Sequence, residues 1–164
     1  MGLSNLGIFH TIIGVAAIVA ALVSFVKYGK INLAVLAGKI YFYGTLVTSL
    51  TALGISKQGG FNAGHIFSLF IVVLIVIAYF LYDKIKGNTK ARYIENFLLS
   101  FSFFLSLVPT VNETLTRVPV GHPIAKGVGD PVIGKTLLAI LILFIVGSVL
   151  QFRSQKKVNV QRGR

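Results

Sequence analysis

The feature that most constrains this chain is a pair of long apolar segments, residues 7–28 and 63–82. Each matches the ~20 residues that an α-helix needs to cross the ~30 Å hydrocarbon core of a bilayer. Inside that core every backbone N–H and C=O must be bonded within the protein, and a helix bonds them within one segment. Each segment also has one histidine near its start, His10 or His65, and runs into Tyr-x-Lys-Ile. The pair therefore predicts two transmembrane helices.

The remaining apolar runs predict three more spans, separated by short polar connections. The expected spans are about residues 6–26, 38–55, 64–82, 94–111 and 132–152. Residues 31–36 are apolar as well and form either a short interfacial helix or an early start of the second span, and Pro109 should kink or end the fourth. With 55% hydrophobic and 12% charged residues, the composition excludes an ordinary soluble domain. The fold class predicted is all-α, an integral membrane bundle of five transmembrane helices, with residues 1–152 as one domain and 153–164 as a basic tail.

The basic residues predict the orientation of this bundle. Of the 16 Lys and Arg residues, only Lys57, Arg117, Lys126 and Lys135 would lie on one side of five spans, which leaves twelve on the other. Because cytoplasmic loops are enriched in Lys and Arg, the N-terminus is expected outside and the C-terminus in the cytoplasm. The formal net charge of +12 lies in short clusters beside the apolar runs. That distribution is typical of topology determinants, and nucleic acid is not expected as a partner.

With this orientation, all three histidines fall on the outer side. His10 and His65 would lie within about one turn of the outer ends of their helices, and the loop after the fourth span adds Glu113, Arg117 and His122. A histidine within a membrane segment costs free energy unless it has a partner or faces water, which makes it a candidate functional residue. The sequence therefore predicts a polar, histidine-containing site on the outer face.

Three kinds of ligand suit such a site, and the sequence leaves them open. His10 and His65 could be the axial ligands of a b-type haem held between two helices. His10, His65, His122 and Glu113 could instead bind a divalent metal ion. In the third interpretation, the histidines donate hydrogen bonds to a small amphipathic molecule such as a quinone headgroup, while Arg117 and Glu113 shape the mouth of its pocket. The plain alternative is that each histidine bonds a carbonyl, a threonine or water and has no ligand.

The cytoplasmic ends of the helices contain a second group of candidates. Lys39 and Tyr41 stand at the start of the second span, and Glu95 stands at the start of the fourth. Lys39 and Glu95 should lie at the same membrane face, where they could pair, although Lys and Tyr are also common interfacial anchors.

Signatures of catalysis are absent from the sequence. It has no serine nucleophile elbow, no phosphate-binding loop and no His-Glu-x-x-His pair, so an enzyme is not expected. Two functional classes remain: a membrane protein that binds a cofactor or ligand, a redox-linked role being one option, or a non-catalytic accessory subunit. The accessory subunit would pack in the bilayer against a larger complex or against further copies of this chain.

The stretch Leu36-Ala37-Gly38-Lys39-Ile40-Tyr41, followed by a threonine-rich span, resembles a bacterial family of multi-span membrane proteins of unknown function. In this resemblance Gly38, Lys39 and Tyr41 match a Gly-Arg-x-Tyr motif, and His10 matches an early histidine of the first span. Apolar Ala34, Val35 and Leu36 occupy the region where that family has a second histidine. The resemblance implies a helical bundle in a bacterial inner membrane.

Overall fold

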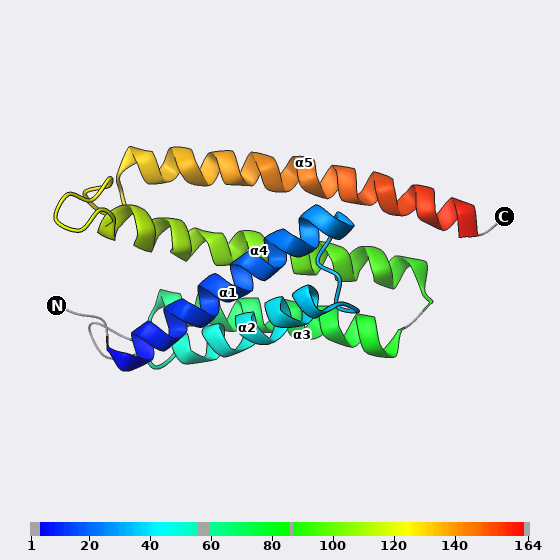
Figure 1. Ribbon diagram of the computed structural model, residues 1–164, viewed down its shortest axis with the longest axis horizontal. Coiled ribbons are helices and arrows are strands. Elements are labelled where there is room, and N and C mark those ends of the chain that lie inside the picture. The colour runs from blue at the N-terminus through cyan, green and yellow to red at the C-terminus, as the bar shows by residue number, and fades with distance from the viewer. Residues whose placement is uncertain (1–3, 56–59, 86, 163–164) are drawn as a thin grey trace. The chain divides into compact units, whose positions relative to one another are not determined.

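The computed structural model describes residues 4–55, 60–85 and 87–162, which form helices and connections and contain no strand (Figure 1). The helices are α1 (Asn5–Tyr28), α2 (Leu36–Ala52), α3 (Ala63–Lys84), α4 (Thr89–Arg117) and α5 (Pro131–Arg162). Four stretches among them are long and apolar enough to cross a membrane: Asn5–Tyr28, Gly64–Lys84, Thr89–Arg117 and Pro131–Asn159. The all-α class is thus confirmed for the described residues. The predicted second span corresponds to α2, which has 17 residues.

Local capping explains where the helices begin and end. The Ser4 hydroxyl accepts a hydrogen bond from the Gly7 N–H at 3.1 Å and starts α1. Gly29 ends α1 with φ 66°, a left-handed conformation that favours glycine, and donates to the Phe25 carbonyl at 2.8 Å. The Asp130 carboxylate precedes α5 and accepts from the Lys126 N–H at 2.9 Å and the Val132 N–H at 3.0 Å. These two donors lower the pKa of the Asp130 carboxyl below its ordinary value.

Several helix bounds differ from the expected spans. Residues 31–35 form a turn ahead of α2 and not an interfacial helix, and α4 continues through Pro109 as far as Arg117. The predicted fourth span stopped at 111, in front of a polar sequence. Within this continuation the Thr116 hydroxyl bonds the Asn112 carbonyl at 2.7 Å, and Glu113 pairs with Arg117 one turn on, which adds a few tenths of a kcal/mol to the helix. Likewise, α5 continues through the basic segment that begins at residue 153.

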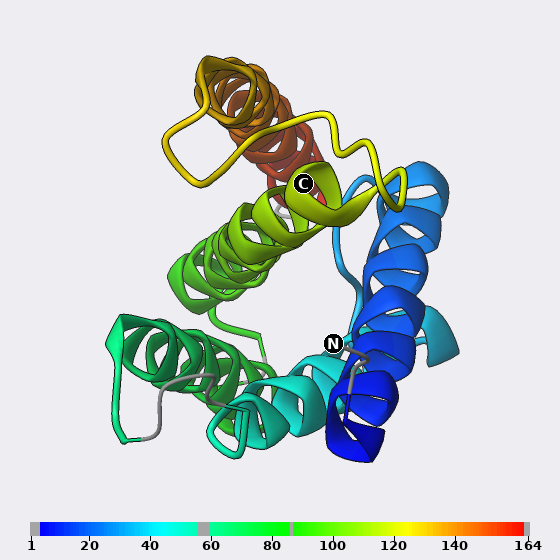
Figure 2. The ribbon, with the colours of Figure 1, turned by 90° about the vertical axis from the view of Figure 1, so that its left-hand side faces the viewer.

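The chain forms two compact units, Met1–Leu99 and Ser100–Arg164, with the boundary inside α4. In the first unit, α2 packs against both α1 and α3 (Figure 2). The approach of α1 to α2 is close because small residues face each other: a Cβ on Gly44 would lie 2.9 Å from the Ala17 Cβ. Ala17 and Ala21 are buried, as expected of small residues at the contact between two membrane helices.

The turn between α1 and α2 is fixed by one buried hydroxyl. Ser24, which is fully buried, donates to the Lys30 carbonyl and accepts from the Asn32 N–H, both at 2.9 Å. Gly38, in the first turn of α2, lies directly against the Asn32 carbonyl, so that a Cβ there would overlap backbone atoms. Serine, asparagine and glycine together thus hold the start of α2 against the turn.

The second unit consists of the remainder of α4, the connection and α5. The rings of Phe101 and Phe104 contact Phe144 at centroid distances of 5.7 and 5.1 Å. A buried hydrogen bond of 3.1 Å joins the Ser100 hydroxyl to Gln151.

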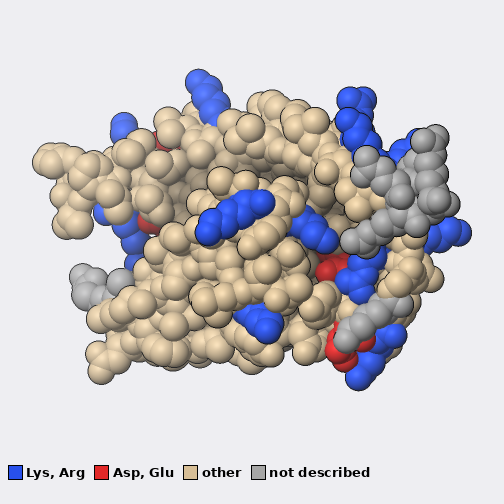
Figure 3. Space-filling view, turned by 45° about the vertical axis from the view of Figure 1, so that its right-hand side comes forward, with Lys and Arg blue, Asp and Glu red and all other residues tan. Residues whose placement is uncertain are grey.

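On the face shown in Figure 3, uncharged residues cover most of the surface and the Lys and Arg side chains emerge from it singly or in small groups. Such a surface suits a chain surrounded by lipid.

Candidate functional site

His65 lies in the first turn of α3. The start of α1, the end of α2 and the start of α3 form one end of the first unit, which we call the histidine end. The Asn62 side chain accepts from the backbone N–H groups of Gly64 and His65 at 2.8 and 3.3 Å. In return, the Asn62 N–H donates to His65 Nδ1 at 3.2 Å. This reciprocal pair is a capping box, in which histidine takes the place usually held by Glu or Gln.

The capping box determines which nitrogen of His65 carries the proton. Nδ1 accepts a hydrogen bond, so the proton of the neutral ring is on Nε2. Nε2 is buried and has no hydrogen-bond partner among the described residues, and the whole side chain is 4% exposed. The Phe61 ring lies beside the imidazole, 5.4 Å between centroids. His65 therefore presents a buried N–H donor that the described protein leaves unsatisfied.

His10 has the opposite arrangement. Its Nδ1 lies 3.2 Å from the Thr51 hydroxyl oxygen, across the α1–α2 contact. The hydroxyl proton of Thr51 is directed to the carbonyls of Val47 and Thr48, at 2.9 and 3.0 Å. The His10 Nδ1–H is therefore the donor to Thr51, and its proton differs in position from that of His65. One turn away, the buried Thr48 hydroxyl has no partner among the described residues.

The other predicted outer residues belong to the second unit. Glu113 and Arg117 form an ion pair of 2.5 Å on α4, with side chains that are 52% and 39% exposed. His122 is exposed in the connection to α5, where its backbone N–H donates to the Pro119 carbonyl at 3.2 Å. Throughout the described ranges, no three His, Asp or Glu side chains gather in a group that could hold a metal ion. The four predicted metal ligands are divided between the two units, His10 and His65 in the first and Glu113 and His122 in the second.

The opposite end of the first unit is formed by the start of α2, the end of α3 and the start of α4, and we call it the basic end. There Glu95 is buried and paired with Arg92. The Arg92 guanidinium lies 2.5 Å from the carboxylate, donates to the Tyr82 carbonyl at 2.9 Å and sits 5.4 Å from the centre of the Tyr82 ring. Arg92 thereby caps the C-terminal end of α3 and compensates the charge of Glu95, its neighbour in α4. The charge partner of Glu95 is thus Arg92, where the sequence suggested Lys39. Tyr41 is fully buried in α2.

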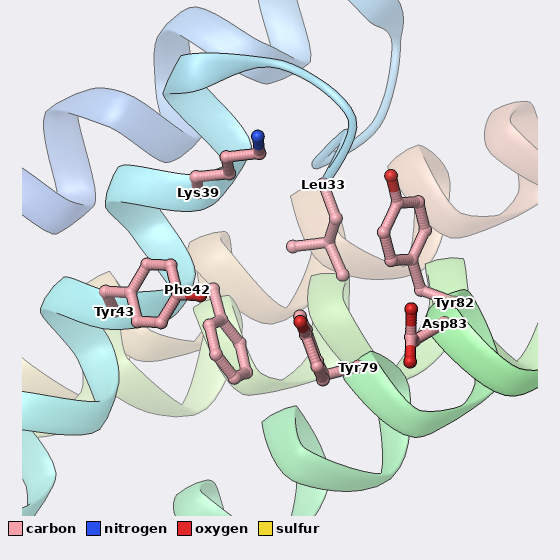
Figure 4. A pocket seen from close by; sticks show the side chains of 7 residues that line it. All are labelled: Leu33, Lys39, Phe42, Tyr43, Tyr79, Tyr82 and Asp83. Carbon is pink, nitrogen blue, oxygen red and sulfur yellow. The ribbon is translucent and has the colours of Figure 1, made fainter.

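Lys39 lines a cavity of about 300 Å³ between the start of α2 and the end of α3 (Figure 4). The lining residues are Leu33, Lys39, Phe42 and Tyr43 on one side and Tyr79, Tyr82 and Asp83 on the other. Phe42 stacks on Tyr79 with centroids 4.8 Å apart and fixes the wall between the two helices. Sequence reasoning named Lys39 but not this cavity.

Sequence reasoning missed Asn62 and did not pair Arg92 with Glu95, although each had a local signal. Asn62 stands three positions before His65, which is the spacing of a capping box. Arg92 stands three positions before Glu95, the spacing at which opposite charges meet on a helix.

Comparison with known proteins adds no functional information. No protein-family model, no curated protein and no solved structure matches this chain.

Proposed function

We propose that the chain spans a bacterial inner membrane five times, with the N-terminus outside and the C-terminal basic segment in the cytoplasm. Four stretches with the length and apolar character of a span support this, together with the uneven distribution of Lys and Arg. The 17 residues of α2 extend over about 26 Å as a helix, close to the thickness of the hydrocarbon core. Under this topology, the histidine end faces outward.

Within this topology, we infer that the histidine end binds a small amphipathic molecule with a carbonyl-type acceptor, such as a quinone headgroup. The observation that carries this proposal is the buried, unpartnered Nε2–H of His65. An unsatisfied buried donor costs roughly 1–3 kcal/mol, and a ligand oxygen within hydrogen-bond distance would recover it. His65 would be the donor, held in orientation by its bond to Asn62.

The same geometry favours this ligand over a haem. To coordinate iron through Nε2, His65 would have to carry its proton on Nδ1, where it would face the Asn62 N–H. Coordination through Nε2 would therefore break the capping box of α3, whereas donating from Nε2 leaves it intact. His10, whose Nδ1–H donates to the Thr51 hydroxyl, already has the tautomer that ligates iron, so this argument against haem applies to His65.

A pair of substitutions at His65 separates ligand binding from helix capping. Gln can accept from the Asn62 N–H and still present an N–H donor, whereas Glu can accept but, when ionised, has no donor. His65→Gln should therefore retain a bound quinone and His65→Glu should lose it, while both remain helical. The measurement is extraction of bound quinone from the detergent-purified protein, with thermal stabilisation by added short-chain benzoquinone and naphthoquinone.

Absorption spectra and metal analysis of the same samples complete the test. A Soret band that disappears in both His65→Gln and His10→Ala would overturn the proposal in favour of haem. Quinone retained equally by His65→Glu and wild type would also overturn it.

The second candidate function, an accessory subunit of a larger membrane complex, is favoured by α5, where only 11% of the apolar window is buried. Such a helix has room for a partner on most of its surface. A native-gel mass for the mildly solubilised protein that equals the monomer plus detergent would rule this candidate out.

A further inference from the structure

The cavity at the basic end of the first unit lies where α2 begins and α3 ends. Lys39 is in the first turn of α2, and Asp83 is next to the last residue of α3. For helices that cross a bilayer, these positions fall at the level of the lipid headgroups, where Tyr and Lys are common. The cavity therefore opens at the depth of phosphate and ammonium groups.

Opposite charges enter this cavity from different helices, as Figure 4 shows. On the α2 side, Lys39 is exposed, and no hydrogen bond or ion pair of its ammonium group is seen among the described residues. On the α3 side, the Asp83 side chain is 33% exposed and lies 2.9 Å from the Lys84 ammonium. Tyr43, Tyr79 and Tyr82 add hydroxyl groups to the lining. The cavity is thus lined by the Lys39 ammonium, by the Asp83 carboxylate that Lys84 also contacts, and by three tyrosines.

The walls between these groups are ordered by aromatic contacts. Tyr43 meets Phe42 edge-on at 5.1 Å, Phe42 stacks on Tyr79 at 4.8 Å, and Tyr79 meets Tyr82 at 6.4 Å. Arg92 stabilises the far end of this row by its position over the Tyr82 ring. Leu33, which is buried, adds an apolar surface. Contacts between neighbouring rings therefore fix the shape of this wall, which lowers the entropy cost of binding.

We propose that this cavity binds the headgroup of a phosphatidylethanolamine lipid. The lipid phosphate would lie on the Lys39 ammonium and the tyrosine hydroxyls, and the ethanolamine ammonium on the Asp83 carboxylate. Phosphatidylglycerol offers no cation to Asp83, and the choline group of phosphatidylcholine has no N–H to donate. This site is at the opposite end of the first unit from His65; it rests on the proposed bilayer topology and not on the ligand proposed for His65.

The test is binding of soluble, short-chain phosphatidylethanolamine, phosphatidylglycerol and phosphatidylcholine to the full chain in detergent, measured by native mass spectrometry. Phosphatidylethanolamine should bind most tightly. Lys39→Met should weaken binding of phosphatidylethanolamine and phosphatidylglycerol by about tenfold, the loss expected for one charge-assisted hydrogen bond. Asp83→Asn should weaken phosphatidylethanolamine alone. Lys90→Met, an exposed lysine at the same end that does not line the cavity, is the matched control and should change nothing.

Tyr43→Phe serves as a milder variant that removes one hydroxyl while keeping the aromatic row. It should weaken phosphatidylethanolamine binding less than Lys39→Met and leave the helical content unchanged. Equal losses in Lys39→Met and Lys90→Met would overturn the proposal, as would tighter binding of phosphatidylglycerol than of phosphatidylethanolamine. Displacement of the lipid by an equal concentration of inorganic phosphate would assign the cavity to free anions and would also overturn it.

Discussion

Replacing Gly38 by alanine tests the tightest backbone contact in the first unit. The new Cβ would overlap the carbonyl group of Asn32 and lie 2.9 Å from the Leu33 nitrogen. These neighbours are backbone atoms and cannot move away as a flexible side chain could. The turn is also held in place, because the Asn32 N–H is bonded to the buried Ser24 hydroxyl at 2.9 Å. Relief of the clash therefore requires the start of α2 to move away from the turn.

The expected loss follows from two contributions. Overpacking at a rigid contact costs about 1–3 kcal/mol, and weakening the Ser24–Asn32 hydrogen bond adds roughly 1 kcal/mol. The higher helix propensity of alanine offsets about 1 kcal/mol of this. The net destabilisation for Gly38→Ala is thus about 1–3 kcal/mol, which corresponds to a melting temperature lower by roughly 2–12 °C for a chain of this size.

The assay is thermal unfolding of the detergent-purified protein, followed by far-ultraviolet circular dichroism. Gly147→Ala is the matched control, since no atom outside the helix backbone lies within 4 Å of its Cβ position. The control should melt at or slightly above the wild-type temperature. If Gly38→Ala has the same melting temperature as the control, the start of α2 is not held against the turn and the reasoning fails.

Two further predictions concern charged groups. Arg92→Met should destabilise the protein by about 3 kcal/mol, because the buried Glu95 carboxylate loses its partner; Glu95→Gln added to it should restore part of the loss in the same melting assay, and no restoration would contradict the pairing. The Asp130 carboxyl has a pKa below its ordinary value. Its contribution to folding stability is therefore present above the unfolded pKa of about 3.9 and is lost as the pH falls through the lower folded pKa. Asp130→Asn should therefore flatten the dependence of melting temperature on pH below about 4, and an unchanged acid slope would refute the assignment.

The helical class could be predicted from hydropathy because a membrane helix needs only a long apolar segment. The helix bounds were less accessible, since they depend on local hydrogen bonds. At residues 31–36 the sequence is apolar, yet Ser24 holds the chain in a turn through Lys30 and Asn32. At the end of α4 the sequence is polar, yet it is helical as far as Arg117, where the Glu113–Arg117 pair lies on the helix surface.

The histidines of the candidate site could be predicted from the sequence, but their hydrogen-bond geometry could not. His10 and His65 stand out in the sequence as the single histidines of two apolar segments, but the sequence does not say which ring nitrogen carries the proton. That depends on Thr51 for one histidine and on Asn62 for the other. The cavity at Lys39 could not be foreseen, because its walls join two helices through the Phe42–Tyr79 stack.

The short turn between α1 and α2 bears on the order in which the chain assembles. Residues 29–35 connect the two helices, so bringing Ala17 against Gly44 closes only a short loop, whose entropy cost is small. All the partners in this contact are synthesised before α3. The first two helices can therefore pair as a hairpin during synthesis, and α3 then meets an already formed surface on α2.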